Sequence, residues 1–566
     1  MPEPVSVKDL DLTPPAGKTY FNSEREWREE FIYFLLVDRF DDGKTRNSPG
    51  GAARSLGSGS LPQLQQFCGG KLQGITNHLD YIKGLGCSAI WLSPVFENND
   101  APDPNSGNYH GYSIQNYLGI DPRFGVKEDL VNLVAAAHER DMRVFLDVVL
   151  NHSGDNWKYP NDDAYFYFND EQFDFGGLRT PDRPLPVELQ NPNYYHRRGQ
   201  IRNWDTFPEY QHGDFYSLKD FNNEETSDGL NLIDTLVRVH SWWIRETDVD
   251  GFRLDAVKHM GEKAVSRFCT GIGEYAHRLG KRQFFMFGEL IAGDPSINAY
   301  TGPNTTTDGT VYFGLSSVLD FPLYFALPDV LKGFAPPSNL KARYDALDGA
   351  ALSRGELGRY LVTFLDNHDG VGQDPNKHRF GAGAPDDQII AAIGYLLTAI
   401  GTPCIYYGTE QGFEGAGPDD AQIREAMFDL DDATKTRLNP DCRIYTEIAK
   451  IAEQFRINPE LRFGRIYFRQ ISGDGVNFGY PTGQPCTLAF SRLLANSGVL
   501  VAFNTSTTIA RSDHVIVDHD LQSGKTAMEI LYSSAGATGS LPITFAADGT
   551  TSVQPSLQPL EFIIAK

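Results

Sequence analysis

The sequence has little positive charge, few methionines and no long apolar run. Its 50 Lys and Arg residues stand against 74 Asp and Glu residues, so the formal net charge over 566 residues is −24 at pH 7. This balance argues against nucleic acid and anionic membrane surfaces as partners, because both attract cationic patches. No apolar stretch reaches the roughly 20 residues that span a bilayer. We therefore expect no nucleic-acid partner and no membrane partner, whereas a neutral ligand is compatible with the charge.

Cysteines are few and scattered, and none forms a CxxC pair. We predict that all six are free thiols, which favours a reducing compartment. The first residues show no basic segment followed by an apolar one, as a secretory signal would. We therefore expect a cytoplasmic protein, or a secreted or periplasmic one if a signal was removed, and we expect a monomer.

Short apolar runs alternate with helical patterns through the first four-fifths of the chain. The helical stretches include 127–140, 229–246, 261–280 and 388–400. Parallel strands covered on both faces give near-continuous apolar runs, and eight of them in βα order predict an α/β fold with a (β/α)8 TIM barrel. The eight runs span residues 31–40, 87–94, 142–152, 249–256, 284–291, 317–323, 360–369 and 402–410.

Two segments break the barrel rhythm. Residues 153–218 are polar, rich in Pro, Asn, Tyr and Asp, and too long for an ordinary loop after the third strand. From about residue 456, short alternating segments separated by Gly, Ser and Asp predict an antiparallel β domain. We therefore predict a barrel domain A over 1–152 (with an N-terminal extension) and 219–455, an inserted domain B over 153–218, and a C-terminal β-sandwich domain C over 456–566.

Four of the predicted strands end in ionisable residues. The carboxyl ends of parallel barrel strands gather at one rim, so these side chains are expected to converge there. For any one strand, a structural ion pair or a surface cap is the alternative, but four coordinated strand ends favour a catalytic site. The residues are Asp147, Asn151 and His152 in the third strand, Arg253 and Asp255 in the fourth, Glu289 in the fifth, and His368 and Asp369 in the seventh.

Two of these carboxyl groups have different predicted surroundings. Strand alternation places Arg253 and Asp255 on the same, lumenal face, and the arginine is expected to lower the pKa of Asp255. Glu289 ends an apolar run, which is expected to raise its pKa and keep it protonated. One ionised and one protonated carboxyl group are what glycoside hydrolysis requires.

The chain resembles the α-amylase superfamily, glycoside hydrolase family 13, over about residues 30–455. DVVLNH, GFRLDAVKH, GEL and FLDNHD match its four signature segments in order, and GCSAIWLSP, HGYSIQNY, LKDFN and GTPCIYYGTE support the match. The N-terminal run from IYFLLVDRFDDG to CGGKLQG is most similar to cyclodextrin glycosyltransferases and their amylase relatives. The resemblance implies an α-glucan or maltooligosaccharide substrate and a retaining mechanism.

Carried over by position, the resemblance implies a role for each residue. Asp255 would be the nucleophile, Glu289 the acid and base, and Asp369 the stabiliser of the transition state. A retaining enzyme of this kind is expected to hold the carboxyl groups of Asp255 and Glu289 about 5–5.5 Å apart. The substrate-binding residues implied are Tyr112, which stacks on the sugar, His152 and His368, which bond its hydroxyls, Arg253, which orients the nucleophile, Asp147, and Lys258 and His259 on the acceptor side.

The resemblance also implies one calcium ion between domains A and B. Its matching ligands are Asn151, Asp220 and the main-chain carbonyl of His259, and such oxygens suit a hard cation. A second calcium site near the N-terminus is predicted absent, because Lys71 replaces an expected Asp and Lys44 an expected oxygen ligand. The ammonium group of Lys71 is expected to occupy the place of the ion and to bind the same oxygens.

Three functions share this set of residues. The first is an α-1,4-glucan hydrolase, and the second is an α-glucan transglycosylase on the same scaffold, with sucrose or trehalose chemistry as a further possibility. The difference between the first two lies in how a sugar hydroxyl competes with water. A non-catalytic relative acting as a binding subunit is the alternative from another class, but all three catalytic carboxylates are present.

Overall fold

Eight parallel strands close into a barrel in the computed structural model, which describes residues 3–46, 59–99, 107–161, 166–224, 231–305, 311–351, 361–373 and 375–566. Each strand lies within one of the eight predicted apolar runs, so the predicted (β/α)8 barrel is confirmed. In chain order, which is also the order around the barrel, the strands are β1 (Ile32–Leu35), β2 (Ala89–Leu92), β5 (Arg143–Val148), β8 (Gly251–Leu254), β9 (Phe285–Gly288), β12 (Ser317–Leu319), β13 (Leu361–Phe364) and β15 (Thr402–Tyr406).

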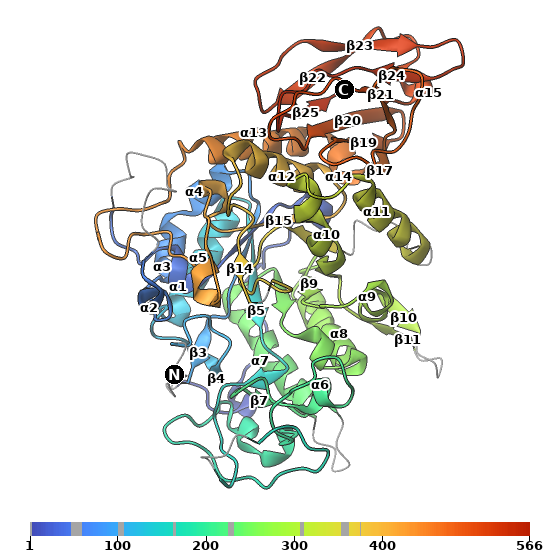
Figure 1. The fold of residues 1–566 in the computed structure, drawn as a ribbon. Helices are drawn as coiled ribbons and strands as arrows, with labels where there is room; N and C mark the ends of the chain where they lie inside the picture. Colours follow the sequence, from blue (N-terminus) through green and yellow to red (C-terminus); the bar gives the residue numbers. More distant parts are fainter. Residues whose placement is uncertain are drawn as a thin grey trace.

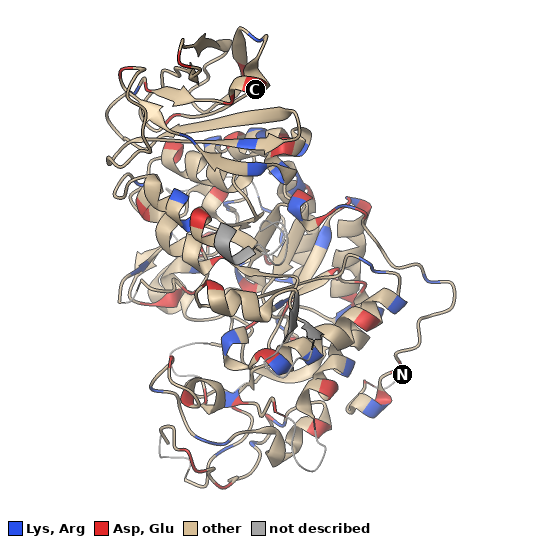
Figure 2. Ribbon diagram, turned by 90° about the vertical axis from the view of Figure 1, so that its right-hand side faces the viewer, with Lys and Arg blue, Asp and Glu red and all other residues tan. Residues whose placement is uncertain are grey.

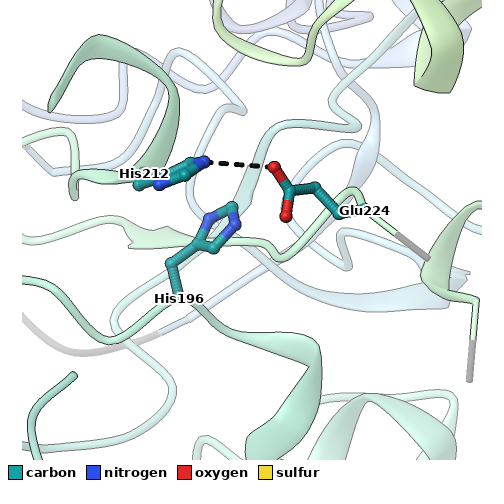
Figure 3. A group of neighbouring side chains, drawn as sticks. All are labelled: His196, His212 and Glu224. Atoms are coloured by element: carbon teal, nitrogen blue, oxygen red, sulfur yellow. Dashed lines mark hydrogen bonds and ion pairs between the residues drawn. The ribbon is translucent and has the colours of Figure 1, made fainter. Parts of the chain in front are cut away.

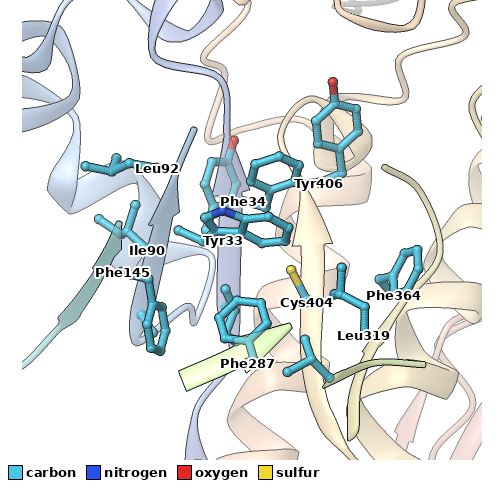
Figure 4. Close-up of a cluster of buried hydrophobic side chains, with 14 of the residues drawn as sticks. Tyr33, Phe34, Ile90, Leu92, Phe145, Phe287, Leu319, Phe364, Cys404 and Tyr406 are labelled. Atoms are coloured by element: carbon cyan, nitrogen blue, oxygen red, sulfur yellow. The ribbon is translucent and has the colours of Figure 1, made fainter. Parts of the chain in front are cut away.

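Aromatic side chains fill the interior of the barrel (Figure 4). The rings of Phe34 and Trp91 stack with centroids 3.7 Å apart, and Phe287 meets Trp91 edge-on at 5.3 Å. Every residue of β1, β2, β5, β8 and β9 is buried, because helices cover the outer face and side chains fill the lumen. A charged residue on the lumenal face of these strands must therefore find its partner inside the protein.

Helices cover the barrel, and four of them lie at the predicted helical stretches. These are α5 (Lys127–Glu139), α7 (Leu232–Thr247), α8 (Glu262–Arg278) and α12 (Asp386–Thr398). Helix α7 starts where the Asn231 side chain accepts a hydrogen bond from the Asp234 amide and ends at Thr247, because the next residue, Asp248, has a φ of 64°, outside the helical region. The other helices are α1 (Val37–Phe40), α2 (Leu61–Leu64), α3 (Leu72–Asn77), α4 (Leu79–Gly84), α9 (Asp294–Tyr300), α10 (Phe321–Leu331), α11 (Ser338–Ala351) and α13 (Arg443–Ile457).

The predicted insert lies between β5 and β8, at the end of the molecule opposite the C-terminal domain (Figure 1). Strand β6 (His152–Ser153) pairs with β7 (Lys219–Asp220) and closes its base. Besides these strands it contains η4 (Val187–Gln190), η5 (Pro192–Tyr194) and α6 (Glu209–His212). An aromatic cluster around the fully buried Trp157, in ring contact with Tyr159 and Tyr195, takes the place of a regular sheet core.

The C-terminal region is an antiparallel β domain, as predicted, and its nine strands form one sheet. Its order is β17-β19-β20-β25-β22-β23-β24-β21-β18, and residues from both halves of the sheet share one apolar cluster that includes Leu500, Val515 and Ile563. The short helices α14 (Pro459–Phe463) and α15 (His519–Gln522) accompany the sheet. The strands are β17 (Arg465–Phe468), β18 (Ile471–Ser472), β19 (Thr487–Leu494), β20 (Ser497–Asn504), β21 (His514–Ile516), β22 (Ala527–Ser533), β23 (Ser540–Phe545), β24 (Thr551–Val553) and β25 (Phe562–Ala565).

The charged residues, the cysteines and the helices can be compared with what the composition predicts. Lys and Arg positions are interspersed with Asp and Glu positions along the ribbon (Figure 2). The six cysteines are free, as predicted. Within the described ranges, no helix has the length and apolarity that a membrane crossing requires. The two-stranded sheets β3 (Phe96–Asn98) with β4 (Ile114–Ile120), β10 (Pro303–Thr305) with β11 (Val311–Phe313), and β14 (Lys377–His378) with β16 (Ala416–Gly417) complete the fold.

Candidate active site

Strands β5, β8 and β9 align the central residues of the site. The register pairs Asp147 with Arg253 across β5 and β8. The amide of Asp255 donates to Val148 O at 3.0 Å, and the amide of Glu289 donates to Leu254 O at 2.8 Å. Hydrogen bonding between the strands thus continues one residue past β8 and β9, so Asp255 and Glu289 emerge side by side at the carboxyl ends of their strands.

One buried guanidinium joins three carboxyl groups. Nη1 of Arg253 donates to Oδ1 and Oδ2 of Asp147 at 2.9 and 3.0 Å and to Oδ1 of Asp255 at 2.7 Å. Nη2 lies 2.8 Å from Oε2 of Glu289. The Arg253 side chain is 1% exposed, and an unpaired charge at that depth would be strongly destabilising. Arg253 and Asp255 therefore do face the lumen, where they belong to a network rather than to a single ion pair.

The chain bends sharply just after Asp255. Ala256 adopts φ 50° and ψ 38°, a left-handed conformation that costs a residue with a Cβ about 1 kcal/mol or more. This bend directs the Ala256 amide to Oε2 of Glu289 at 3.1 Å, and the next amide, of Val257, donates to the Glu289 carbonyl at 3.0 Å. Strained backbone here fixes the position of the Glu289 carboxyl group relative to Asp255.

The two central carboxyl groups differ in acidity. Burial raises the pKa of Asp255 to about 6 despite the attraction of Arg253, and the Asp147 carboxylate adds to the rise. Burial raises the pKa of Glu289 to about 8, against Arg253 and with the help of the Asp255 and Asp369 carboxylates. The predicted lowering for Asp255 is thus wrong, because desolvation outweighs the cation, whereas the predicted rise for Glu289 is confirmed. Between these values Asp255 is ionised while Glu289 keeps its proton.

Asp147 and Tyr112 form the next layer of the site. The carboxylate of Asp147 accepts from Tyr112 Oη at 2.9 Å and from Trp91 Nε1 at 3.1 Å, in addition to Arg253. Burial raises the pKa of Asp147 to about 6. The Tyr112 ring is half-buried and stacks on His368 with centroids 5.5 Å apart and an interplanar angle of 10°. Asp147 therefore orients both the arginine and the tyrosine and is itself enclosed.

The two rim histidines are buried and neutral. Burial lowers the pKa of His152 to about 3 and that of His368 well below the usual range. Nε2 of His368 is 2.9 Å from Tyr112 Oη, while its Nδ1 is buried without a hydrogen-bond partner. Neither ring nitrogen of His152 makes a well-aligned hydrogen bond, although the main chain of Tyr112 lies near it. Such unpaired ring nitrogens suit a ligand that carries hydroxyl groups.

Asp369 faces the same rim and is held by a residue that the sequence did not identify. Its Oδ1 lies 2.9 Å from Nη2 of Arg424, and its Oδ2 lies 3.3 Å from Nε2 of His368. Arg424 also donates through Nε to the His368 carbonyl at 2.7 Å. It follows η9 (Asp420–Ile423) in the loop after β15, and its position beyond a barrel strand was the available signal.

Lys258 and His259 contact the insert. Lys258 Nζ donates to the Trp204 carbonyl at 3.0 Å and to Asp205 at 2.5 Å. His259, at the end of η6 (Val257–His259), lies with Nδ1 2.5 Å from the Tyr210 carbonyl. Another residue that the sequence did not identify, Tyr216, is 65% exposed, and its ring lies 5.9 Å from that of Trp204. The predicted acceptor side thus carries exposed aromatic surface.

The residues predicted to bind calcium fit a hard cation. Nδ2 of Asn151 donates to Oδ1 of Asp220 at 3.4 Å, while Oδ1 of Asn151 is buried without a hydrogen-bond partner. Asp220 is 1% exposed, and burial together with the Asp214 carboxylate raises its pKa well above the usual range. A bound cation would satisfy the amide oxygen and neutralise the carboxylate. His259, the predicted source of the carbonyl ligand, is close enough to His152 to lower its pKa.

The N-terminal loop predicted to lack calcium holds a different cation from the one expected. Arg46 Nη1 lies 2.6 Å from Oδ1 of Asp42 and 3.4 Å from Oδ2 of Asp41, and its side chain is 4% exposed. Lys44 pairs with Asp42 at 2.7 Å. The Lys71 side chain, predicted to occupy the place of the ion, is exposed. The guanidinium of Arg46, rather than the ammonium of Lys71, therefore pairs with the carboxylate oxygens of this loop.

Comparison with known proteins identifies the family. The protein-family model described as alpha amylase, catalytic domain, matches residues 34–443 of the chain. The chain is 31% identical over 502 residues to an alpha-amylase of Streptomyces lividans, covering 78% of this chain and 51% of the relative, and 30% identical over 408 residues to a cyclomaltodextrin glucanotransferase of Klebsiella oxytoca, covering 68% and 58%. It thus spans about half the length of these curated relatives.

Solved structures agree over nearly the whole chain. A crystal structure of an Anoxybacillus alpha-amylase superposes with a TM-score of 0.68 at 25% identity, covering 96% of this chain and 98% of that one. A cyclomaltodextrin glucanotransferase with a three-domain distribution superposes with a TM-score of 0.69 at 25% identity, covering 95% and 98%. The family match, the barrel and the placement of the carboxylates agree: the chain belongs to the alpha-amylase family.

Proposed function

We propose that the protein is a retaining hydrolase that cleaves α-1,4-glucosidic bonds of starch or maltooligosaccharides. At family level it is an α-glucan hydrolase or transglycosylase. One observation carries the finer proposal: a single guanidinium, that of Arg253, holds Asp255 and Glu289 side by side while their pKa values differ, at about 6 and about 8. Two carboxyl groups in opposite protonation states are the requirement for double displacement.

In the first step, a carboxylate oxygen of Asp255 bonds to the anomeric carbon while the glycosidic bond breaks. The proton of Glu289 passes to the departing oxygen, so the leaving sugar departs as an alcohol and Glu289 becomes a carboxylate. The Asp255 carboxylate is one of the groups that raise the pKa of Glu289. Once Asp255 is an ester its charge is gone, so the pKa of Glu289 falls and the group stays ionised through the intermediate.

In the second step, Glu289 accepts a proton from water as the water oxygen bonds to the anomeric carbon. The ester bond to Asp255 breaks, and Asp255 leaves as a carboxylate beside Arg253. Two displacements at one carbon restore the original configuration. Asp369 is proposed to bind sugar hydroxyls and to stabilise the positive charge of the transition state. His152, His368 and Tyr112 are proposed to contact the same sugar ring, since ring nitrogens of both histidines have no hydrogen-bond partner and the Tyr112 ring is only partly buried.

Calcium is proposed at Asn151, Asp220 and the carbonyl of His259, where it would supply a positive charge between barrel and insert. The pairing of β6 with β7 brings the side chains of Asn151 and Asp220 together, and His152 follows Asn151 directly in the chain. The proposed calcium site and the sugar-binding rim therefore share a short segment of chain. Loosening this segment is expected to change substrate binding as well as stability.

Hydrolysis is proposed over transfer because polar groups of the acceptor side are already engaged. Lys258 Nζ and His259 Nδ1 already contact main-chain and side-chain oxygens of the insert, so these side chains have less hydrogen-bonding capacity left for an incoming sugar hydroxyl. Water then competes more effectively for the intermediate. The exposed Tyr216 favours transglycosylation as the second candidate, because an aromatic face stacks on an acceptor sugar. The relatives carry both activities in their names.

The test is a time-resolved product profile from maltoheptaose and from soluble starch, with Asp255→Asn as the inactive control. Shorter maltooligosaccharides alone, absent in the control, are the expected result. Products longer than the substrate, or cyclic products, would replace the hydrolase with the transglycosylase. Absence of turnover on both substrates would overturn both and direct the assay to sucrose and trehalose.

A further inference from the structure

Two histidines of the insert and a glutamate just after it gather at one point, apart from the barrel carboxylates. The rings of His196 and His212 stack with centroids 4.3 Å apart. The Glu224 carboxylate lies next to both rings (Figure 3). One ring nitrogen from each histidine and one carboxylate oxygen all lie within 4.8 Å of one another. Three donor atoms from separate segments therefore surround a space the size of a single ion.

The donor atoms that face this space lack other partners. Nδ1 of His196 is 2.5 Å from Oδ2 of Asp220, which leaves Nε2 as its free atom, and that atom is buried without a hydrogen-bond partner. The side chain of His196 is 8% exposed. In His212, Nδ1 is likewise buried and unpartnered, while Nε2 makes a long contact of 3.3 Å to Oε1 of Glu224. Buried polar atoms left unpaired are costly, and a bound ion would remove that cost.

The chemistry of the donors selects the kind of ion. Burial lowers the pKa of both histidines, so the imidazoles are neutral, which is the metal-binding form. A carboxylate on the far nitrogen of His196 is the usual outer-shell arrangement of a metal-bound histidine. Two imidazoles, one carboxylate and an open position suit zinc, whereas calcium prefers oxygen ligands throughout.

We propose that His196, His212 and Glu224 form a second metal site, which binds one zinc-type divalent cation with water in the fourth position. Tetrahedral bonds of about 2.0–2.1 Å place ligand atoms about 3.4 Å apart. The donors lie within 4.8 Å of one another, so the pair that is farthest apart must approach by up to about 1.4 Å. Glu224, whose side chain is 66% exposed, is free to make that movement. The guanidinium of Arg198 lies close enough to lower the pKa of both histidines, and the Glu224 carboxylate acts in the opposite direction on His212.

The site would clamp the part of the insert that faces the barrel. His212 is the last residue of α6, and Tyr210 of the same helix bonds to His259. His196 lies in the chain between β6 and β7, the two strands that close the insert, and its Nδ1 contacts Asp220 of β7. An ion here would hold α6 against that base, and hence against Lys258 and His259, without touching the catalytic carboxylates. The inference does not depend on the proposed hydrolase activity.

The test is titration of the full chain with Zn²⁺ by calorimetry in saturating Ca²⁺, which separates the two sites. Wild type is expected to bind one equivalent, and Co²⁺ in place of zinc is expected to give the intense visible absorption of tetrahedral coordination. Glu224→Gln is expected to weaken zinc binding at least tenfold, and His212→Asn to abolish it. His378→Asn, which removes an exposed histidine elsewhere, is the control and should leave binding unchanged.

Zinc binding that both Glu224→Gln and His212→Asn leave intact would overturn the proposal, as would a wild-type chain that binds no zinc. Because Glu224 is exposed, its substitution is not expected to unfold the chain even if that of His212 does. The unfolding temperature of each variant without zinc shows whether the comparison is between folded proteins. A zinc-induced rise in that temperature is expected for wild type and for the His378 control, and not for Glu224→Gln at the same zinc concentration.

Discussion

Removing the charge of Arg253 is predicted to move the whole pH–activity profile to alkaline pH. Wild-type activity requires Asp255 ionised and Glu289 protonated, so kcat/KM should form a bell between about pH 6 and about pH 8. Arg253 lowers the pKa of both groups. Arg253→Met removes that attraction, and a neighbouring charge of this kind shifts a carboxyl pKa by about 1–3 units. The pKa values that set the two limbs are expected to rise, so both limbs move to higher pH.

The size of the effect follows from the position of the acid limb. With a pKa of about 6, roughly nine-tenths of Asp255 is ionised at pH 7. A rise of about two units would leave roughly one-tenth ionised, a tenfold loss at pH 7 from protonation alone, and part of it should return at higher pH. The assay is kcat/KM against pH on a chromogenic maltooligosaccharide, where the position of a limb does not depend on how much enzyme is folded.

A matched control lies on the neighbouring strand β5. Arg143 opens β5, is 1% exposed and pairs with Glu30 at 3.2 Å, at the opposite end of the barrel from the catalytic carboxylates. Arg143→Met should also lower the stability of the fold, because it removes one of the two cations that pair with the buried Glu30 carboxylate, but Arg25 remains 3.0 Å from it and the bell should not move. A bell in Arg253→Met that is lower but unshifted would refute the reasoning, since it would reduce Arg253 to a structural support.

Three further predictions concern stability. Glu289→Gln should stabilise the fold increasingly as pH rises from about 4.5 to about 8. The folded-state pKa of Glu289 lies above its unfolded value, so wild type loses stability over that window, by at most about 4–5 kcal/mol, whereas glutamine does not titrate. Thermal unfolding of both proteins at the two ends of the window tests this, and an equal difference in stability at both ends would contradict it. Gly251→Ala should lower the free energy of unfolding in urea by about 1–3 kcal/mol, since its Cβ would lie 2.2 Å from the Phe285 carbonyl oxygen. Gly273→Ala in α8, where a Cβ would have open space around it, should be neutral or stabilising. Similar effects of the two substitutions would refute the packing argument. Chelation of calcium should lower the unfolding temperature of wild type and have little effect on Asn151→Ala, and equal effects on both would remove Asn151 from the proposed calcium site.

The barrel was predictable because its strands carry strong local signals. All eight apolar runs contain a barrel strand, since strands buried on both faces have little freedom in composition. The ends of the strands followed from the same logic, and Asp147, Arg253, Asp255 and Glu289 do meet in one network. Position along a strand was enough to bring these residues together.

The predictions that failed, and the residues that were missed, depended on the relative size of opposing effects and on contacts that the sequence pattern does not reveal. The pKa of Asp255 could not be predicted from the neighbouring Arg253 alone, because the outcome is the difference between desolvation and attraction, and burial is a property of the fold. Arg424 reaches Asp369 from 55 positions along the chain. Arg46, rather than Lys71, pairs with the acidic loop, and this contact is local, since Arg46 lies four residues after Asp42. His196 and His212 lie in a segment without periodicity, so their convergence had no signature in the sequence.

The measurement that tests the account most directly is the anomeric configuration of the first product from maltoheptaose, followed by proton NMR before mutarotation. The account predicts that the new reducing ends appear as the α-anomer and that none appear with Asp255→Asn. New reducing ends that appear as the β-anomer would contradict it, because attack by Asp255 followed by attack of water must retain configuration.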